Sequence, residues 1–157
     1  MNIVLIAIGK TDNHALQELI DSYAGRLRHY VNFELEIIPD IKNNKHFSKT
    51  RQKKIEGENL LKKLRPTDML VLFDEHGKHY TSPEFASYLQ GKMNSGIKRL
   101  ALAIGGPYGF SPEVFARAQG KISLSKMTFS HQMVRLFVVE QIYRGFSILR
   151  NEPYHHR

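Results

Sequence analysis

The chain contains no cysteine among its 157 residues. This absence excludes disulfide bonds, thiolate metal sites and cysteine nucleophiles, and it fits a protein of the cytoplasm. Long apolar runs are missing as well, because residues 3–8 and 100–104 fall far short of the roughly 20 apolar residues that a membrane-spanning helix needs. The first residues carry no basic leader and no small-residue cleavage site, so we expect no signal peptide.

Acidic residues are few relative to basic ones: Asp and Glu number 15 against 23 Lys and Arg, which gives a net charge of +8. Such an excess favours a polyanionic partner, with nucleic acid first and an anionic membrane surface second. The hydrophobic share of 41% and the charged share of 24% are those of a globular protein. A chain of this length can bury one core, so we predict a single domain over residues 1–157.

Apolar spacing predicts strands that alternate with helices along the whole chain. We expect strands at 4–8, 33–37, 69–73, 99–104 and 122–124, and helices at about 12–29, 48–64, 82–93 and 131–149, with a short helix after 111. The expected helix caps are Asp12 or Asn13, Ser82 and Ser111. This alternation predicts an α/β fold whose sheet is mainly parallel and carries helices on both faces.

A basic segment lies between Asp40 and Pro66. Its cations repel one another, and contact with a phosphate backbone would relieve that repulsion and release counterions. We therefore favour polyanion binding here, with a solvated helix face as the alternative. The candidates for RNA contact are Lys49, Arg51, Lys53 and Lys54, and Lys42, Lys45, Lys62, Lys63 and Arg65 complete the cationic set.

A glycine cluster, residues 105–109, follows the fourth expected strand. In open α/β sheets ligands bind at the carboxyl ends of strands, and glycine lets the backbone approach a ligand closely. The cluster has neither the spacing of a GxGxxG motif nor that of a GxxxxGK[ST] motif. We therefore disfavour dinucleotide oxidoreductases and exclude P-loop nucleotide hydrolases. A tight turn is the alternative interpretation.

Residues 124–129 join the fifth expected strand to the last helix without a glycine or a proline. Loops usually contain such residues, so backbone held here, with one lysine and two hydroxyls, can line a small-molecule site. The alternative is a simple start to the next helix, with Thr128 or Ser130 as its N-cap and Met127 as a hydrophobic staple.

The last expected helix is apolar over most of its circumference, which indicates burial against a second subunit as well as its own sheet. Two polar pairs interrupt it at helical spacing: His131 with Arg135, and Glu140 with Arg144. Each can be an ordinary pair on a helix surface. An arginine on an otherwise apolar helix is nonetheless costly unless it meets an anion.

The chain ends in Tyr154, His155, His156 and Arg157. A histidine can move a proton near neutral pH, and a tyrosine can hydrogen-bond or stack on a base, although chain ends are often frayed. The remaining histidines lack metal-ligand spacing such as HExxH, so we predict no metal site.

Six short motifs stand in order along the chain and are specific when taken together. They are Asp74-Glu75-x-Gly77, Ile104-Gly105-Gly106-Pro107-x-Gly109, Leu124-Ser125-Lys126-Met127-Thr128, His131-Gln132 with Arg135, Glu140-Gln141-x-Tyr143-Arg144, and Pro153-Tyr154-His155. On these motifs the chain resembles the bacterial methyltransferases of the SPOUT superfamily that modify N3 of a pseudouridine in large-subunit ribosomal RNA. The resemblance covers essentially the whole chain.

This resemblance implies an α/β fold whose C-terminal part is threaded into a trefoil knot, and a homodimer packed through the knotted region. It also implies S-adenosylmethionine as the cofactor. The residues that would hold this cofactor are Phe73, Gly105, Gly106, Leu124, Ser125, Lys126, Met127, Thr128 and Phe129.

The substrate implied by the resemblance is a pseudouridine in the helix 69 loop of 23S rRNA, presented on the assembled ribosome. Tyr154 and His155 would position the base and handle its proton. Arg144 would steady the developing anion or an RNA phosphate. The presence of His156 after the Tyr-His pair leaves open which histidine acts.

Arg135 and His131 would bind substrate near the subunit interface. Two other functions stay open at this point. One is a SPOUT enzyme that modifies a tRNA base, and the other is a non-catalytic RNA- or ribosome-binding module that takes no cofactor.

Overall fold

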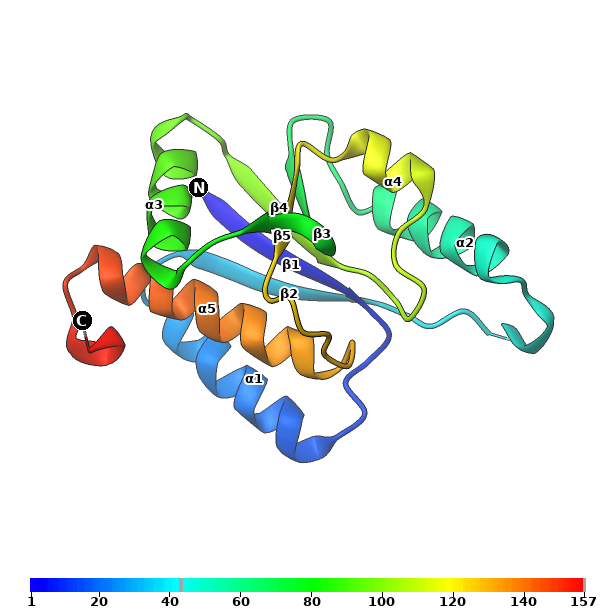
Figure 1. The fold of residues 1–157 in the computed structure, drawn as a ribbon, viewed down its shortest axis with the longest axis horizontal. Helices are drawn as coiled ribbons and strands as arrows, with labels where there is room; N and C mark the ends of the chain where they lie inside the picture. Colours follow the sequence, from blue (N-terminus) through cyan, green and yellow to red (C-terminus); the bar gives the residue numbers. More distant parts are fainter. Residues whose placement is uncertain (43, 157) are drawn as a thin grey trace.

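A computed structural model describes residues 1–42 and 44–156 (Figure 1). Arg157, which the sequence places in the basic tail, lies outside these residues. The strands are β1 (Asn2–Ile8), β2 (Asn32–Ile38), β3 (Met69–His79), β4 (Arg99–Ile104) and β5 (Gly120–Ser123). The helices are α1 (His14–Leu27), α2 (Lys49–Leu61), α3 (Ser82–Asn94), α4 (Pro112–Arg117) and α5 (Met133–Leu149), with short 3-10 turns η1 (Asn44–His46) and η2 (Pro153–His155).

The five strands form one sheet in the order β2-β1-β4-β3-β5, and every pair of neighbours is parallel. Helices α1, α3 and α5 cover one face, while α2 and α4 cover the other (Figure 1). The predicted α/β fold, with a mainly parallel sheet and helices on both faces, is confirmed. Within the described residues, no helix has both the length and the apolar character needed to cross a membrane.

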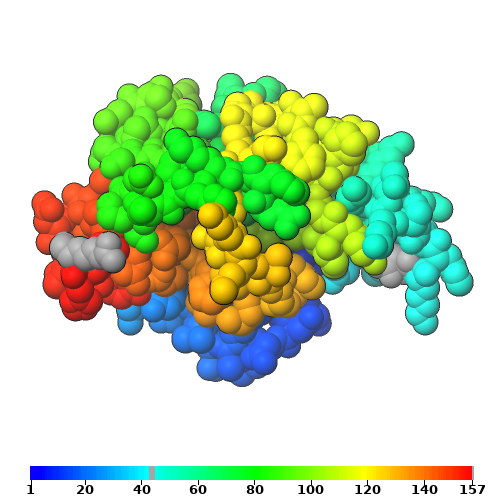
Figure 2. Space-filling model, in the orientation of Figure 1, coloured from blue at the N-terminus to red at the C-terminus, as the bar shows by residue number. Residues whose placement is uncertain are grey.

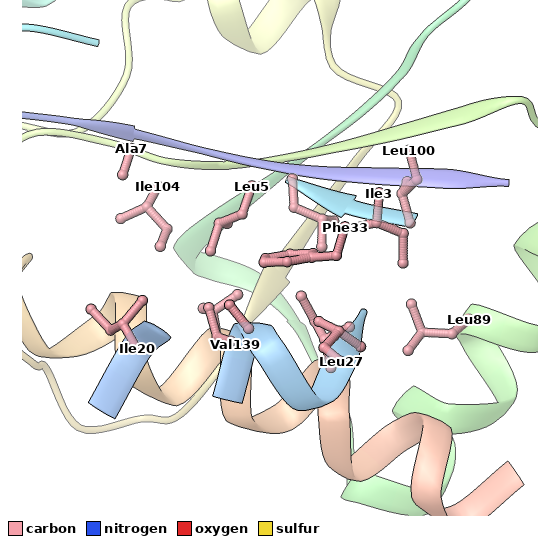
Figure 3. Close-up of a cluster of buried hydrophobic side chains, with 14 of the residues drawn as sticks. Ile3, Leu5, Ala7, Ile20, Leu27, Phe33, Leu89, Leu100, Ile104 and Val139 are labelled. Atoms are coloured by element: carbon pink, nitrogen blue, oxygen red, sulfur yellow. The ribbon is translucent and has the colours of Figure 1, made fainter. Parts of the chain in front are cut away.

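The larger core lies between the sheet and the helices α1, α3 and α5. Figure 3 shows Leu5 and Phe33 of the sheet facing Ile20, Val139 and Leu89 of the three helices. The central strands β1 and β4 are buried on both faces, which explains their nearly continuous apolar sequences. A smaller core on the opposite face joins β1, β3 and β4 to α2 and α4.

Side-chain caps set most of the helix starts. Asn13 accepts a hydrogen bond from the Leu16 amide, and Ser111 accepts one from the Val114 amide, so both predicted caps are confirmed. The prediction of Ser82 as the third cap is wrong, because Thr81 takes that place. Only Thr81 stands three residues before a glutamate, Glu84, with which it exchanges the reciprocal hydrogen bonds of a capping box.

Strand β3 is longer than the predicted 69–73, because it resumes after an interruption. Phe73 and Lys78 both pair with Ile122 of β5, so residues 74–77 bulge out of the ladder between them. Gly77 passes so close to β5 that a Cβ atom there would lie 2.5 Å from the Ile122 carbonyl carbon. The bulge therefore depends on glycine at this position, and it lies at the carboxyl end of the buried part of β3.

Candidate functional site

An open cleft of about 1140 Å³ lies at the carboxyl ends of β3, β4 and β5. The glycine loop 105–109, the bulge residues Asp74–His76 and the loop 124–131 all line it. Figure 2 shows the chain near residue 125 (gold) at the surface between the green chain around β3 and the orange start of α5. The structure thus brings together the two loops that sequence analysis singled out separately, and every predicted cofactor-binding residue lines this cleft.

A smaller cavity of about 230 Å³ adjoins the cleft. Phe73, Leu124 and Phe129 line both spaces, and the far side of the smaller cavity is formed by aromatic residues that include Tyr80 and Phe137. A ligand with a polar end and a flat apolar end could therefore lie across the two.

The glycine loop is closed on itself. The Gly109 amide donates to the Gly106 carbonyl at 3.1 Å, and Gly109 has a φ of +81°, a conformation that favours glycine. A Cβ atom at Gly105 would lie 3.3 Å from the Gly109 backbone. A larger side chain at Gly105 would therefore push against the loop itself.

The loop 124–129 keeps its shape through serine side chains. Ser123 Oγ donates to the Ser125 carbonyl at 3.0 Å, and Ser125 Oγ accepts from the Met127 amide at 3.0 Å. These side-chain hydrogen bonds to the backbone stabilise the turn, which explains how the loop turns without a glycine or a proline. Ser130 Oγ accepts from the Met133 amide, but the N-cap position of α5 is Gln132, so neither Thr128 nor Ser130 is the N-cap. Met127 is 77% exposed, so the expectation that its side chain packs as a hydrophobic staple is wrong.

The basic segment meets the cleft at the start of α2. Lys49 and Lys53 line the cleft, and Lys49 Nζ lies 5.3 Å from the centre of the Tyr108 ring in the glycine loop. Arg51 and Lys54 are exposed on the same helix but do not line the cleft. The four predicted RNA-contact residues thus divide into a pair at the cleft and a pair on the outer surface.

Arg135 lies inside the fold, with only 1% of its surface exposed. Its guanidinium donates to the Ile8 and Gly9 carbonyls, both at 2.6 Å, and to the His131 carbonyl at 3.3 Å. These hydrogen bonds go to backbone carbonyl oxygens rather than to a carboxylate, while the nearby charges of Asp12 and Asp40 also favour the charged guanidinium. Arg135 therefore ties α5 to β1, whereas His131 lines the cleft.

The tail forms a second polar cluster, at the far end of α5. Glu140 Oε1 accepts from Arg144 Nη2 at 2.6 Å, from Arg144 Nε at 3.0 Å and from the Tyr154 hydroxyl at 2.9 Å. Arg144 Nη1 lies 3.2 Å from His155 Nδ1. The structure brings the three predicted catalytic residues together, and it adds Glu140, which sequence spacing marked only as a partner of Arg144.

The protonation states in this cluster follow from its contacts. Burial, together with hydrogen bonds to Tyr23 and Glu140, raises the pKa of Tyr154 above its ordinary value of 10.0, so its hydroxyl stays a donor. An arginine can only donate, so His155 Nδ1 accepts and the proton of the neutral ring sits on Nε2. That Nε2 atom is buried and has no partner within residues 1–42 and 44–156.

Figure 1 shows α5 running from the chain around residues 124–131, which lines the cleft, toward the tail turn η2 at its other end. A helix rises about 1.5 Å per residue, so Arg144 lies about 15 Å along the axis from Val134, which lines the cleft. None of Arg144, Tyr154 and His155 lines the cleft in this subunit. Over the part of the chain that the structure describes, no three His, Asp or Glu side chains are grouped so that they could hold a metal ion.

Comparison with known proteins gives consistent results. A family described as "Predicted SPOUT methyltransferase" matches residues 1–155. The chain is 64% identical over 157 residues to a protein of Flavobacterium johnsoniae named "Ribosomal RNA large subunit methyltransferase H", with 100% of both chains covered. Proteins of the same name from Parabacteroides distasonis and Porphyromonas gingivalis are 58% and 51% identical over 156 residues, with 99% of each chain covered.

Proposed function

Since the chain belongs to the SPOUT methyltransferase family, we propose that it transfers a methyl group from S-adenosylmethionine to large-subunit ribosomal RNA. The finer proposal is that the methyl acceptor is N3 of a pseudouridine in the helix 69 loop of 23S rRNA, on the assembled ribosome. The observation that carries the proposal is the cleft, whose walls are the glycine loop 105–109 and the loop 124–129. The names of the full-length relatives support the RNA substrate.

The residues of the cleft fit S-adenosylmethionine. Gly105 and Gly106 let the backbone approach the ligand, and loop 124–129 presents backbone groups at the opposite wall. Phe73, Leu124 and Phe129 offer apolar surface for an adenine ring, in the smaller cavity beside the cleft. The bound cofactor would supply a methyl group already activated by its positive sulfur. The protein's task is then to position the base and to help its N3 atom lose a proton.

The tail cluster is equipped to stabilise a base that loses the N3 proton. His155 Nε2–H is a hydrogen-bond donor without a partner among residues 1–42 and 44–156, and Arg144 adds a positive charge beside it. Donors of this kind stabilise negative charge on the oxygens of an imide as its proton passes to solvent. We therefore assign His155 and Arg144 the stabilisation of that anion, and Tyr154 the positioning of the base.

A homodimer would bring these residues to a cleft. Arg144 lies about 15 Å along α5 from Val134, the residue of this helix that lines the cleft, so we propose that the tail completes the cleft of a second subunit. Apolar side chains gather beside the cleft at the start of α5, where Phe129, Met133 and Phe137 are exposed. Such a patch suits burial against another copy. The trefoil knot implied by the family resemblance forms part of the same proposal.

The basic pair at the cleft would hold the RNA. Lys49 and Lys53 line the cleft, while Arg51 and Lys54 continue the positive surface outward along α2. Cations arranged from a cleft outward can follow a phosphate backbone while one base enters the site.

Calorimetry with S-adenosylmethionine, followed by methyl incorporation, tests this function. We expect binding by the purified dimer, and tritium transfer from the labelled cofactor into intact ribosomes in preference to free 23S rRNA or tRNA. Ribosomes that already carry the modification are the matched control. Preferred labelling of tRNA would favour the alternative SPOUT substrate. An absence of binding at millimolar cofactor would favour a non-catalytic RNA-binding module.

A further inference from the structure

Helix α2 carries a buried carboxyl group, that of Glu56, which is only 6% exposed. Its Oε1 atom has no hydrogen-bond partner within the described residues, and its Oε2 atom accepts only from Gln52 Nε2, at 3.5 Å. Burial raises the pKa of Glu56 above its ordinary value of 4.5. A buried carboxyl group with so few hydrogen bonds lowers the stability of the fold. Its own hydrogen bonds therefore do not explain why a carboxyl group lies at this position.

The carboxyl group of Glu56 lies directly against the glycine loop. A Cβ atom at Gly106 would lie 2.8 Å from both carboxyl oxygens and 3.1 Å from the carboxyl carbon. Gly106 lines the cleft and Glu56 does not, so the glycine backbone stands between the carboxyl group and the proposed cofactor. Glu56 therefore supports the back of the cleft wall.

The residue after Glu56 holds α2 against the chain that follows the loop. A Cβ atom at Gly57 would lie 2.4 Å from Ser111 Oγ and 3.0 Å from Val114 Cγ2, so α2 and the start of α4 are in direct contact. Leu60 of α2 shares the smaller core with Val114. The glycine loop is thus enclosed between β4 and α4, and α2 presses on it from behind.

We propose that Glu56 is a positioning residue, which holds the glycine loop 105–109 in the conformation that admits the cofactor by packing its carboxyl group against Gly106. The proposal rests on the proposed function of the cleft. A loop with several glycines has great conformational freedom, so an external support reduces the cost of ordering it when the ligand binds. Because α2 also carries Lys49 and Lys53, one helix supports both the cofactor loop and the RNA contacts.

A mutant cycle measured by calorimetry tests the proposal. Glu56→Ala should weaken the binding of S-adenosylmethionine about tenfold, while Glu56→Gln, which keeps the shape, should stay within about twofold of the wild type. Gly106→Ala should also weaken binding, because its methyl group collides with the carboxyl group. In the Glu56→Ala background Gly106→Ala should cost less, since the vacated space accepts the methyl group. Glu58→Ala, an exposed glutamate on the same helix, is the matched control.

All affinities are compared well below the melting temperature of every variant, so that a general loss of stability does not change them. Wild-type affinity in Glu56→Ala, or strictly additive effects in the double variant, would overturn the proposal. If Glu56→Ala does not fold, Glu56→Asp replaces it, because the shorter side chain withdraws the carboxyl group from Gly106 and keeps the charge. A wild-type protein that does not bind the cofactor would instead contradict the proposed function.

Discussion

Replacing Arg135 with methionine distinguishes a structural role, in which the residue ties α5 to β1, from the substrate-binding role predicted from the sequence. In the structure its guanidinium joins the start of α5 to the end of β1 through the Ile8 and Gly9 carbonyls, each at 2.6 Å. Methionine keeps much of the length and the apolar part of the side chain but donates no hydrogen bond. Two buried carbonyl groups would then lose their strongest partner. We therefore expect Arg135→Met to lower stability without changing the RNA-binding surface.

The size of the effect follows from these contacts. A hydrogen bond from a charged group contributes about 1.5–3 kcal/mol, so the two short bonds contribute about 3–6 kcal/mol before other terms. Part of this is offset, because burial disfavours the charged guanidinium and lowers the pKa of Arg135. A net loss of about 2–4 kcal/mol remains, and for a chain of this size it lowers the Tm by about 4–16 °C.

Calorimetric melting and RNA binding, measured on the same preparations, check this expectation. The control is Arg150→Met, which makes the same change at the exposed end of the same helix and should lower the Tm by only about 1–3 °C. Binding of a helix 69 RNA hairpin at low temperature should be the same for wild type and Arg135→Met. An unchanged Tm combined with RNA binding weakened more than about tenfold would refute the structural role and restore the substrate role predicted from sequence.

Three further expectations concern the proposed site. His155→Ala should reduce methyl transfer by about 100-fold or more while cofactor affinity stays nearly unchanged, and equal losses in both measurements would remove His155 from the reaction. Neutralising Lys49 and Lys53 to glutamine should weaken RNA binding and reduce the slope of log K against log salt concentration by about 1.4–1.8; an unchanged slope would place the RNA elsewhere. Glu56→Gln should have a higher Tm than the wild type at neutral pH. A carboxyl group whose pKa is raised in the folded state stabilises the wild type fully at a pH below its unfolded pKa of 4.5. That stabilisation is lost as the pH rises through the folded pKa. The difference in Tm should therefore close as the pH falls toward 4.5, and a gap that does not vary with pH would contradict the burial of this charge.

The tail illustrates how far sequence spacing reaches. The four-residue separation of Glu140 and Arg144 indicates a pair on one helix face, and the structure contains that pair at 2.6 Å. Spacing says nothing of Tyr154, whose hydroxyl reaches the same carboxylate from a separate turn, or of Tyr23 on α1, which lies 3.1 Å from Tyr154. These contacts join residues more than ten positions apart in sequence, so only the packing of α1, α5 and η2 brings them together.

The amino-acid sequence by itself determined the local elements of this protein and their alternation, because strand periodicity, caps such as Asn13 and the glycine loop depend on neighbouring residues. Tertiary structure alone decided which loops share the cleft, that Arg135 is buried on backbone carbonyls, and that Glu56 packs behind Gly106. The order of the parallel strands sets those neighbours, since it aligns the carboxyl ends of β3, β4 and β5 at one edge of the sheet. Periodicity records which face of an element is buried, but it does not record which distant segment buries it.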